Sequence, residues 1–194
     1  MKIGLYGAGG FGREVFPLIG GHDRHLLADT EFAQPDTVTL EQFLDAGGTH
    51  FNVALGDWKA RKRLAELCEE HELTPFSIIS TRAYLGPGST IGEGAIIMPM
   101  ASVSTPARIG RFFQANFHAI IGHDVQVGDY VTVGPAAVIL GNAMIGGGAY
   151  IGTGATIMPG IKVGKQAVIG AGAVVLKDVP DGATMVGIPA RPIK

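Results

Sequence analysis

The hydrophobic positions between Ala83 and Asp178 recur every six residues. In each group of six the third position is aliphatic, from Leu85 through to Val175, and only the small Ala115 departs from this. The first position is usually a small residue and the fourth is most often glycine. A helix repeats its apolar positions every three or four residues and an ordinary strand every two, so neither explains the period. A six-residue period of this length predicts a repeated structural unit.

The six-residue unit fits a short strand followed by a turn. Three such units would close a triangular coil of eighteen residues. Successive coils would pair their backbones about 4.8 Å apart, and the aliphatic column would fill the inside of the prism. We therefore predict a parallel β-helix, a solenoid in which each coil contacts only its neighbours.

A different pattern occupies the chain before residue 76. Residues 2–6, 25–28 and 51–55 have the composition of buried strands, and helical patterns lie between and after them. Alternation of strands and helices predicts a small doubly wound α/β domain, a Rossmann-like half domain, over residues 1–75. The β-helix domain with its C-terminal tail would then occupy residues 76–194.

Composition narrows the partners and the compartment. The formal net charge of −2 gives no electrostatic reason to expect binding to nucleic acid or to an anionic membrane. Cys68 is the only cysteine, so no internal disulfide is possible and a reducing compartment fits. No signal peptide and no apolar run long enough to span a bilayer is evident. We expect a cytoplasmic protein without membrane insertion.

A glycine-rich turn, G-x-G-x-x-G, occupies residues 7–12 after the first strand and before a helix, and Asp29 follows the second strand. This order predicts a site for a nucleotide pyrophosphate, held by backbone N–H groups at the helix N-terminus. The alternative is a tight turn that only lets the helix lie close to the strand. Because the domain is half of a dinucleotide fold, a nucleotide-linked sugar suits it better than the dinucleotide of a dehydrogenase.

One segment of the repeat, residues 114–124, carries two histidines, an asparagine and an acid where other corners are mostly Gly, Pro and Ala. Eighteen residues beyond His123 is Gly141, so Gly141 should lie directly above His123 in the next coil. A residue without a side chain would leave room for a ligand there and present its backbone N–H. We predict that His123 is a general base, oriented by the Asp124 carboxylate, in an acyl transfer.

Two further interpretations of the histidines remain. His118 and His123 have the spacing of the zinc-dependent carbonic anhydrases built on a β-helix. Those proteins need a third histidine about two coils earlier, where this chain has Arg82 and Pro87. We therefore expect no metal. The second interpretation is that both histidines are solvated surface residues at corners.

The motifs together resemble a known family, the hexapeptide-repeat sugar O- and N-acyltransferases. This family includes sialic-acid O-acetyltransferases (NeuD type) and UDP-4-amino-sugar N-acetyltransferases (PglD type). The resemblance implies a left-handed β-helix and a homotrimer with acetyl-CoA along the clefts between subunits. It also implies that the first domain holds the nucleotide of the sugar. The matching features are GAGGFG at 7–12, Asp29, LGDWKAR at 55–61, N-x6-H-D at 116–124, Gly141-Asn142 and VGIPARPI at 186–193.

The resemblance also implies residue roles. His123 would take the proton from the sugar amine, Asp124 would orient it, and Asn116 would help to position the acceptor. The Gly141 N–H would bind the thioester carbonyl, where negative charge develops. The chain departs from the family at Asp124, where Glu is frequent, at Phe11, where His is common, and at Thr132, where some members have a second His. The implied CoA-binding residues are Thr132, Gly141, Thr153 and Ala171, and the implied nucleotide pocket is formed by Gly9, Gly10, Phe11, Asp29, Gly56 and Asp57.

The sequence thus predicts an acetyl-CoA-dependent N-acetyltransferase that acts on a nucleotide-linked amino sugar, most simply a UDP-4-amino-sugar, for surface-glycan synthesis. Transfer would be direct, without a covalent acyl-enzyme. O-acetylation of a sialic-acid-type sugar needs the same base and is the main competing hypothesis. A metal-dependent, carbonic-anhydrase-like protein and a non-catalytic β-helix are less favoured. A non-catalytic β-helix should lack both the His-Asp pair and the glycine above it.

Overall fold

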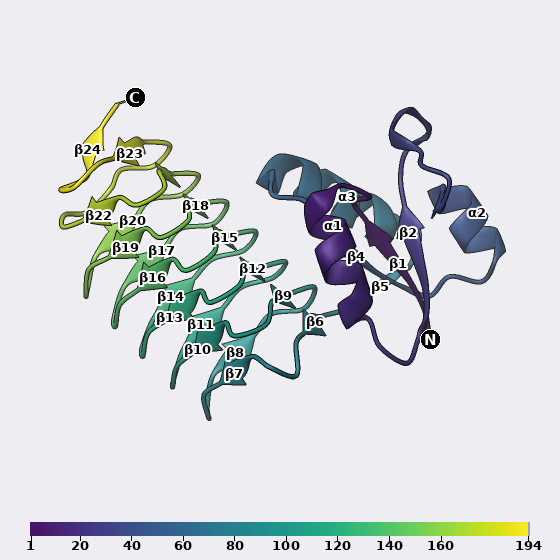
Figure 1. Ribbon diagram of the computed structural model, residues 1–194, viewed down its shortest axis with the longest axis horizontal. Coiled ribbons are helices and arrows are strands. Elements are labelled where there is room, and N and C mark those ends of the chain that lie inside the picture. The colour runs from purple at the N-terminus through teal and green to yellow at the C-terminus, as the bar shows by residue number, and fades with distance from the viewer. Residues whose placement is uncertain (194) are drawn as a thin grey trace. The chain divides into compact units, whose positions relative to one another are not determined.

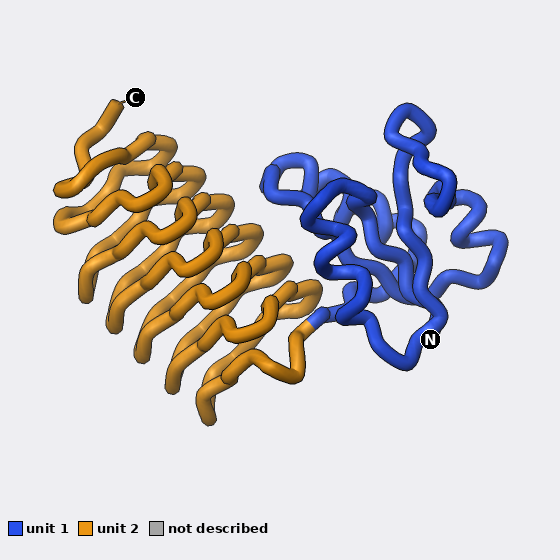
Figure 2. The backbone as a smooth tube through the Cα atoms, in the orientation of Figure 1, with its two compact units in different colours: residues 1–78 blue, residues 79–194 orange. Residues whose placement is uncertain are grey.

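The computed structural model describes residues 1–193. The chain folds into two compact units, which divide between Ile78 and Ile79. Figure 2 shows the first unit in blue and the second in orange. Among residues 1–193, no helix combines the length and the apolar character that crossing a bilayer requires.

The first unit is the predicted α/β fold. Its five strands form one parallel sheet in the order β3-β2-β1-β4-β5. The strands are β1 Lys2–Tyr6, β2 Asp23–Leu27, β3 Thr37–Val38, β4 His50–Val53 and β5 Thr74–Pro75. The helices are α1 Gly10–Val15, α2 Leu40–Asp45 and α3 Trp58–Glu70, with short 3-10 segments η1 Phe16–Leu18 and η2 Thr30–Phe32.

Local sequence explains where the helices start. Thr39 begins α2 with a capping box, in which its hydroxyl accepts from the N–H of Gln42 and the Gln42 side chain accepts from the N–H of Thr39. Asp57 begins α3, because its carboxylate accepts from the N–H of Ala60 at 2.7 Å. The buried face of α3 includes Leu64 and Cys68, which lie four residues apart on one side of the helix.

The second unit is the predicted β-helix, and Figure 1 shows its coils as a stack of short arrows. Almost every strand is two residues long, and from β6 to β22 the strands follow one another at six-residue steps. They are β6 Ile78–Ile79, β7 Tyr84–Leu85, β8 Thr90–Ile91, β9 Ile96–Ile97, β10 Ser102–Val103, β11 Arg108–Ile109, β12 Gln114–Ala115, β13 Ile120–Ile121, β14 Gln126–Val127, β15 Thr132–Val133, β16 Val138–Ile139, β17 Met144–Ile145, β18 Tyr150–Ile151, β19 Thr156–Ile157, β20 Lys162–Val163, β21 Val168–Ile169, β22 Val174–Val175, β23 Thr184–Val186 and β24 Arg191–Pro192.

Three sheets make the three faces of the prism. We call them the first face (β7, β10, β13, β16, β19, β22), the second face (β8, β11, β14, β17, β20) and the third face (β6, β9, β12, β15, β18, β21, β23, β24). Ile121 pairs in parallel with Ile139, so one coil takes eighteen residues, as predicted. β24 pairs antiparallel with β23 and ends this ladder at the C-terminal side.

The interior of the prism is the aliphatic column seen in the sequence. Val103, Ile121, Ile139 and Ile157 are fully buried, and so is the exceptional Ala115. Because each face is only two residues wide, the chain must turn sharply between faces. The third of the four residues in many corners takes a positive φ. This geometry decides which side chains reach the edges of the prism.

Candidate functional site

His123 lies in the corner that joins β13 to β14, on the edge between the first and second faces. The carbonyl of His123 accepts from the N–H of Asn142 at 2.9 Å, which fixes the next coil directly against this corner. A methyl group built on Gly141 would lie 2.5 Å from both Cε1 and Nε2 of the His123 ring. The imidazole therefore covers Gly141, in the place that the eighteen-residue coil predicts.

Asp124 holds the His123 ring. The Nδ1–H of His123 donates to Oδ2 of Asp124 at 2.8 Å, and the two side chains are 61% and 49% exposed. Asp124 has a φ of 58°, which places its carboxylate beside the neighbouring ring. Because Nδ1 carries the proton in this hydrogen bond, Nε2 keeps its lone pair and can accept a proton from a substrate.

The backbone above the ring offers a hydrogen-bond donor. The Gly141 carbonyl accepts from the N–H of Gly160 at 3.0 Å. Its own N–H has no acceptor among the residues that the structure describes. A base and an unused backbone donor thus lie side by side, which is the arrangement that an acyl transfer through a tetrahedral intermediate requires.

The other β-helix residues predicted for the acyl-transfer site do not lie on the edge that carries His123. Asn116, Thr153 and Ala171 occupy the edge between the third and first faces, and Thr132 lies in β15 on the third face. Thr153 and Ala171 are in successive coils, because Gly172 donates its N–H to the Thr153 carbonyl at 2.8 Å. Within one chain, the whole first face separates this edge from His123.

The two histidines of the metal interpretation are also on different edges. His118 lies between β12 and β13, with a φ of 57°, and His123 lies between β13 and β14. Within residues 1–193, no group of three His, Cys, Asp or Glu side chains is arranged to hold a metal ion. The H-x4-H spacing in this chain therefore does not bring the two rings together.

A second candidate site is a cavity of about 590 Å³ in the first unit. The β1–α1 turn, the β2–β3 loop and one side of α3 form its walls. Of the six residues predicted for the nucleotide, Gly9 and Asp29 line it, whereas Gly10, Phe11, Gly56 and Asp57 do not. The lining residues are Tyr6, Gly7, Ala8, Gly9, Leu27, Ala28, Asp29, Glu31, Phe32, Ala33, Gln34, Leu55, Ala60, Arg63 and Leu64.

The glycines of the turn divide into two pairs. Gly7 has a φ of 116°, and a methyl group on Gly12 would lie 1.5 Å from the Gly7 carbonyl oxygen. These two glycines are required for the turn and for the close approach of α1. At Gly9 and Gly10, by contrast, an added methyl group would meet nothing within 4 Å. The tight-turn interpretation accounts for the first pair, and the second pair leaves open space beside the backbone.

Charges and hydrogen bonds organise the rest of the cavity. Arg63 of α3 lies 3.8 Å from the Asp29 carboxylate, and Gln34 donates to the Ala8 carbonyl at 3.3 Å. Burial raises the pKa of the Tyr6 phenol well above its usual range, so it stays protonated. Sequence reasoning missed Arg63. The signal that could have found it is the helical spacing of Ala60, Arg63 and Leu64, which share one side of α3.

Comparisons with known proteins show which family the chain resembles. Residues 142–177 match the family described as bacterial transferase hexapeptide (six repeats). GDP-perosamine N-acetyltransferase from Escherichia coli O157:H7 is 38% identical over 149 residues, which span 69% of this chain and 67% of that protein. The structure of WeeI from Acinetobacter baumannii AYE has 34% identity and a TM-score of 0.93, with 100% of both chains covered. PerB from Caulobacter crescentus, solved in complex with CoA and GDP-perosamine, has 26% identity and a TM-score of 0.94, with 100% of this chain and 98% of that one covered.

Proposed function

The chain belongs to the hexapeptide-repeat family of sugar acyltransferases, whose left-handed β-helix it shares, and we propose that it moves the acetyl group of acetyl-CoA to the amine of a nucleotide-linked amino sugar. The observation that carries this proposal is the 2.8 Å hydrogen bond from His123 to Asp124, with the imidazole lying over the bare backbone of Gly141. The product would serve the synthesis of surface glycans.

The reaction is a direct transfer. Nε2 of His123 takes a proton as the sugar amine attacks the acetyl carbonyl, and Asp124 stabilises the imidazolium that forms. The carbonyl oxygen gains negative charge, which the Gly141 N–H stabilises. When the tetrahedral intermediate collapses, the C–S bond breaks and CoA leaves as a thiol after receiving the proton. Acetyl-CoA and sugar are bound together, so the kinetics are sequential.

The first unit would hold the nucleotide. The open space at Gly9 and Gly10 admits a diphosphate close to the backbone, and the Arg63 guanidinium can neutralise phosphate charge. The Asp29 carboxylate would accept hydrogen bonds from the ribose hydroxyls. Asp57 is committed to capping α3, so we assign it a supporting role in the position of the β4–α3 turn.

A homotrimer would complete the acyl-transfer site. The outward side chains of the first face carry no charge, whereas the second face presents Arg108 and Lys162. On the first face, Tyr84 and Ile120 are 56% and 45% exposed, as expected of a surface that another copy covers. A threefold arrangement brings different edges of neighbouring chains together. It would therefore place Asn116, Thr153 and Ala171 of one chain near His123 of the next, with CoA between them.

Replacing the base tests the proposal. His123→Gln should lower the rate of CoA release by about 10²–10⁴-fold, the usual contribution of general base catalysis. CoA release is measured with a thiol reagent in the presence of amino-sugar nucleotides. The control is His71→Gln, which changes an exposed histidine of the first unit and should leave the rate unchanged. Turnover of His123→Gln near the wild-type rate would exclude the assigned base.

The product distinguishes the two acceptor classes. An amide formed on an amine survives treatment with hydroxylamine, whereas an ester formed on a hydroxyl is cleaved by it. We expect the acetylated product to survive. Release of acetyl hydroxamate would instead assign the chain to O-acetylation of a sugar.

A further inference from the structure

The β2–β3 loop forms the wall of the first unit's cavity beyond Asp29. Residues 31–34 of this loop all line the cavity, and Gln34 ties the loop to the β1–α1 turn through the Ala8 carbonyl. Because Asp29 stands where a ribose is expected, the next part of the loop is in place to contact the base. The following inference rests on the proposed function and concerns which base that is.

Phe32 offers a flat apolar surface on this wall. Its side chain lines the cavity and yet is 67% exposed, and no other aromatic ring of residues 1–193 stacks on it. An aromatic ring at the rim of a nucleotide cavity is suited to stacking on a base. A purine covers more of such a ring than a pyrimidine does.

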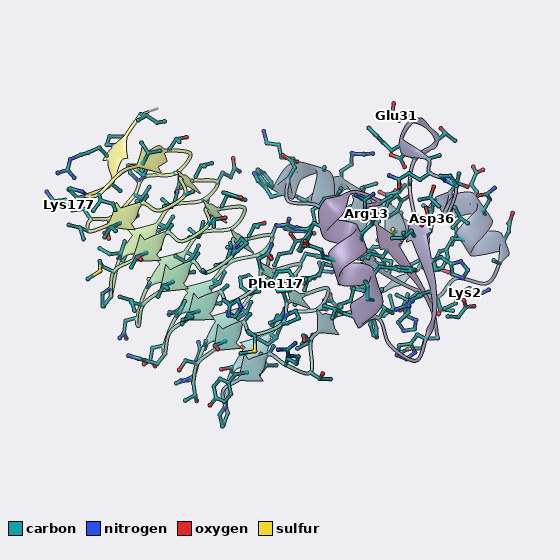
Figure 3. The ribbon with its side chains drawn as sticks, viewed as in Figure 1. Lys2, Arg13, Glu31, Asp36, Phe117 and Lys177 are labelled. Atoms are coloured by element: carbon teal, nitrogen blue, oxygen red, sulfur yellow. The ribbon has the colours of Figure 1, made fainter. Side chains whose placement is uncertain are left out.

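Glu31 is a lining acid that has no ion-pair partner within residues 1–193. The second lining carboxylate, Asp29, faces Arg63 at 3.8 Å. Glu31 is exposed and makes no hydrogen bond or ion pair with any described residue. Figure 3 shows its side chain on the loop that carries η2. An ionised carboxylate can only accept hydrogen bonds, so it is complementary to a base edge with two neighbouring donors.

Among the common bases, guanine has that edge. Its N1–H and N2–H₂ groups are neighbouring donors, which two carboxylate oxygens can accept together. Uracil and thymine present one N–H between two carbonyls, and adenine presents its amino group next to an acceptor nitrogen. We propose that Glu31 and Phe32 select guanine, so that the acceptor is a GDP-linked amino sugar rather than the uridine-linked one that sequence resemblance favours. The relative that acts on GDP-perosamine agrees with this choice.

Binding of free nucleotides to the full-length protein tests the selection. Dissociation constants for GDP, IDP and UDP are measured by calorimetry for the wild type, Glu31→Gln and Glu70→Gln. IDP lacks the guanine N2 amino group. Glu70→Gln removes the same charge from an exposed residue outside the cavity. A bidentate pair discriminates between bases by about 10- to 100-fold.

We expect the wild type and Glu70→Gln to bind GDP about 10- to 100-fold more tightly than UDP, with IDP in between. In Glu31→Gln, GDP affinity should fall about tenfold or more and UDP affinity should stay within about twofold. UDP binding tighter than GDP binding, or GDP affinity unchanged in Glu31→Gln, would overturn the guanine assignment and leave the transferase proposal standing. Failure of the wild type to bind any of the three would overturn the nucleotide role of the first unit as well.

Discussion

The two units present their candidate sites in opposite ways. The first unit encloses a cavity of about 590 Å³ within one chain, and a loop, a turn and a helix form its walls. The β-helix presents His123 and Asp124 on an open edge, with more than half of the imidazole surface exposed. The difference indicates a division of labour. Under the proposed function, the first unit would bind the nucleotide with its own walls, whereas CoA and a neighbouring chain would enclose the reacting atoms at the His123 edge.

The architecture explains this contrast. In a solenoid each coil contacts only the coils above and below it, so no part of the same repeat can fold over an outward side chain. In an α/β unit the loops at the ends of the strands can close over a ligand. The β-helix instead fixes which residues of successive coils lie against one another along its axis. Between β7 and β22, a strand residue lies directly against the residue eighteen positions away, as Ile121 lies against Ile139.

Among the tests of this contrast, the largest expected effect concerns that placement. Gly141→Ala would put a methyl group 2.5 Å from Nε2 of His123, so the ring must move away from its place above the backbone. A displacement of about 1 Å at a reacting group costs roughly 100-fold in rate. We therefore expect kcat to fall by about that factor while nucleotide binding to the first unit stays unchanged, measured by CoA release and by calorimetry.

The matched control is Gly147→Ala, at the same position of the next six-residue unit. A methyl group there would lie 3.2 Å from the Asp129 carbonyl oxygen and touch no catalytic group. Its kcat should match the wild type. If both alanine variants lose activity equally, or if neither does, then the contact between ring and glycine is not what sets the rate.

Replacing Gly12 by alanine should lower the free energy of unfolding by about 1–3 kcal/mol more than replacing Gly9 does. In Gly12→Ala the new methyl group would collide with the Gly7 carbonyl, so the turn or α1 must shift. Gly9→Ala meets nothing within 4 Å and should leave the free energy of unfolding nearly unchanged. It should instead weaken nucleotide binding by narrowing the open space. Urea denaturation and calorimetry measure the two effects, and equal stability of the two variants would contradict this division of the motif.

The oligomeric state tests whether acetyl transfer at the edge that carries His123 requires a neighbouring chain. Ile120→Arg places a charge in the centre of the uncharged first face and should lower the mass in solution by about threefold, from trimer to monomer. Acetyl transfer should fall with it, and nucleotide binding should persist. Gln126→Arg makes the same kind of change on the second face, six residues later, and should remain trimeric. Light scattering after size-exclusion chromatography measures the mass. A trimer of unchanged mass in Ile120→Arg would show that the first face is not the interface.

Much of this architecture could be predicted from the sequence, because each six-residue repeat of the chain forms one strand and one corner of the β-helix. The six-residue pattern specified the coil, and a step of eighteen residues placed Gly141 against His123. In the same way, the G-x-G-x-x-G turn lies where the structure has a cavity, which Gly7 and Gly9 line; its role in nucleotide binding stays a prediction.

The sequence could not predict what depends on contacts between distant segments. Helical spacing places Arg63 on the same side of α3 as Ala60 and Leu64, but only the packing of α3 brings that side to the cavity and to Asp29. Asp57, predicted for the nucleotide pocket, is directed to the Ala60 N–H by its position at the start of α3. Asn116 and His123 belong to one motif in the sequence and yet lie on different edges, because a corner intervenes on each side of β13.

The smallest effect concerns Cys68, the only thiol of the chain, which lies buried in α3. Burial raises the pKa of Cys68 to about 12, so the protonated form predominates in the folded protein and the thiolate forms only as the pH approaches that value. At pH 8 roughly one thiol in ten thousand is then ionised, and the thiolate is the form that reacts. We expect iodoacetamide to leave the native protein unlabelled at this pH, to label it fully in urea, and to have no effect on acetyl transfer. Labelling of the native protein as fast as free cysteine, with loss of activity, would place a reactive thiol in the unit that we assign to nucleotide binding and reopen a covalent acyl-enzyme.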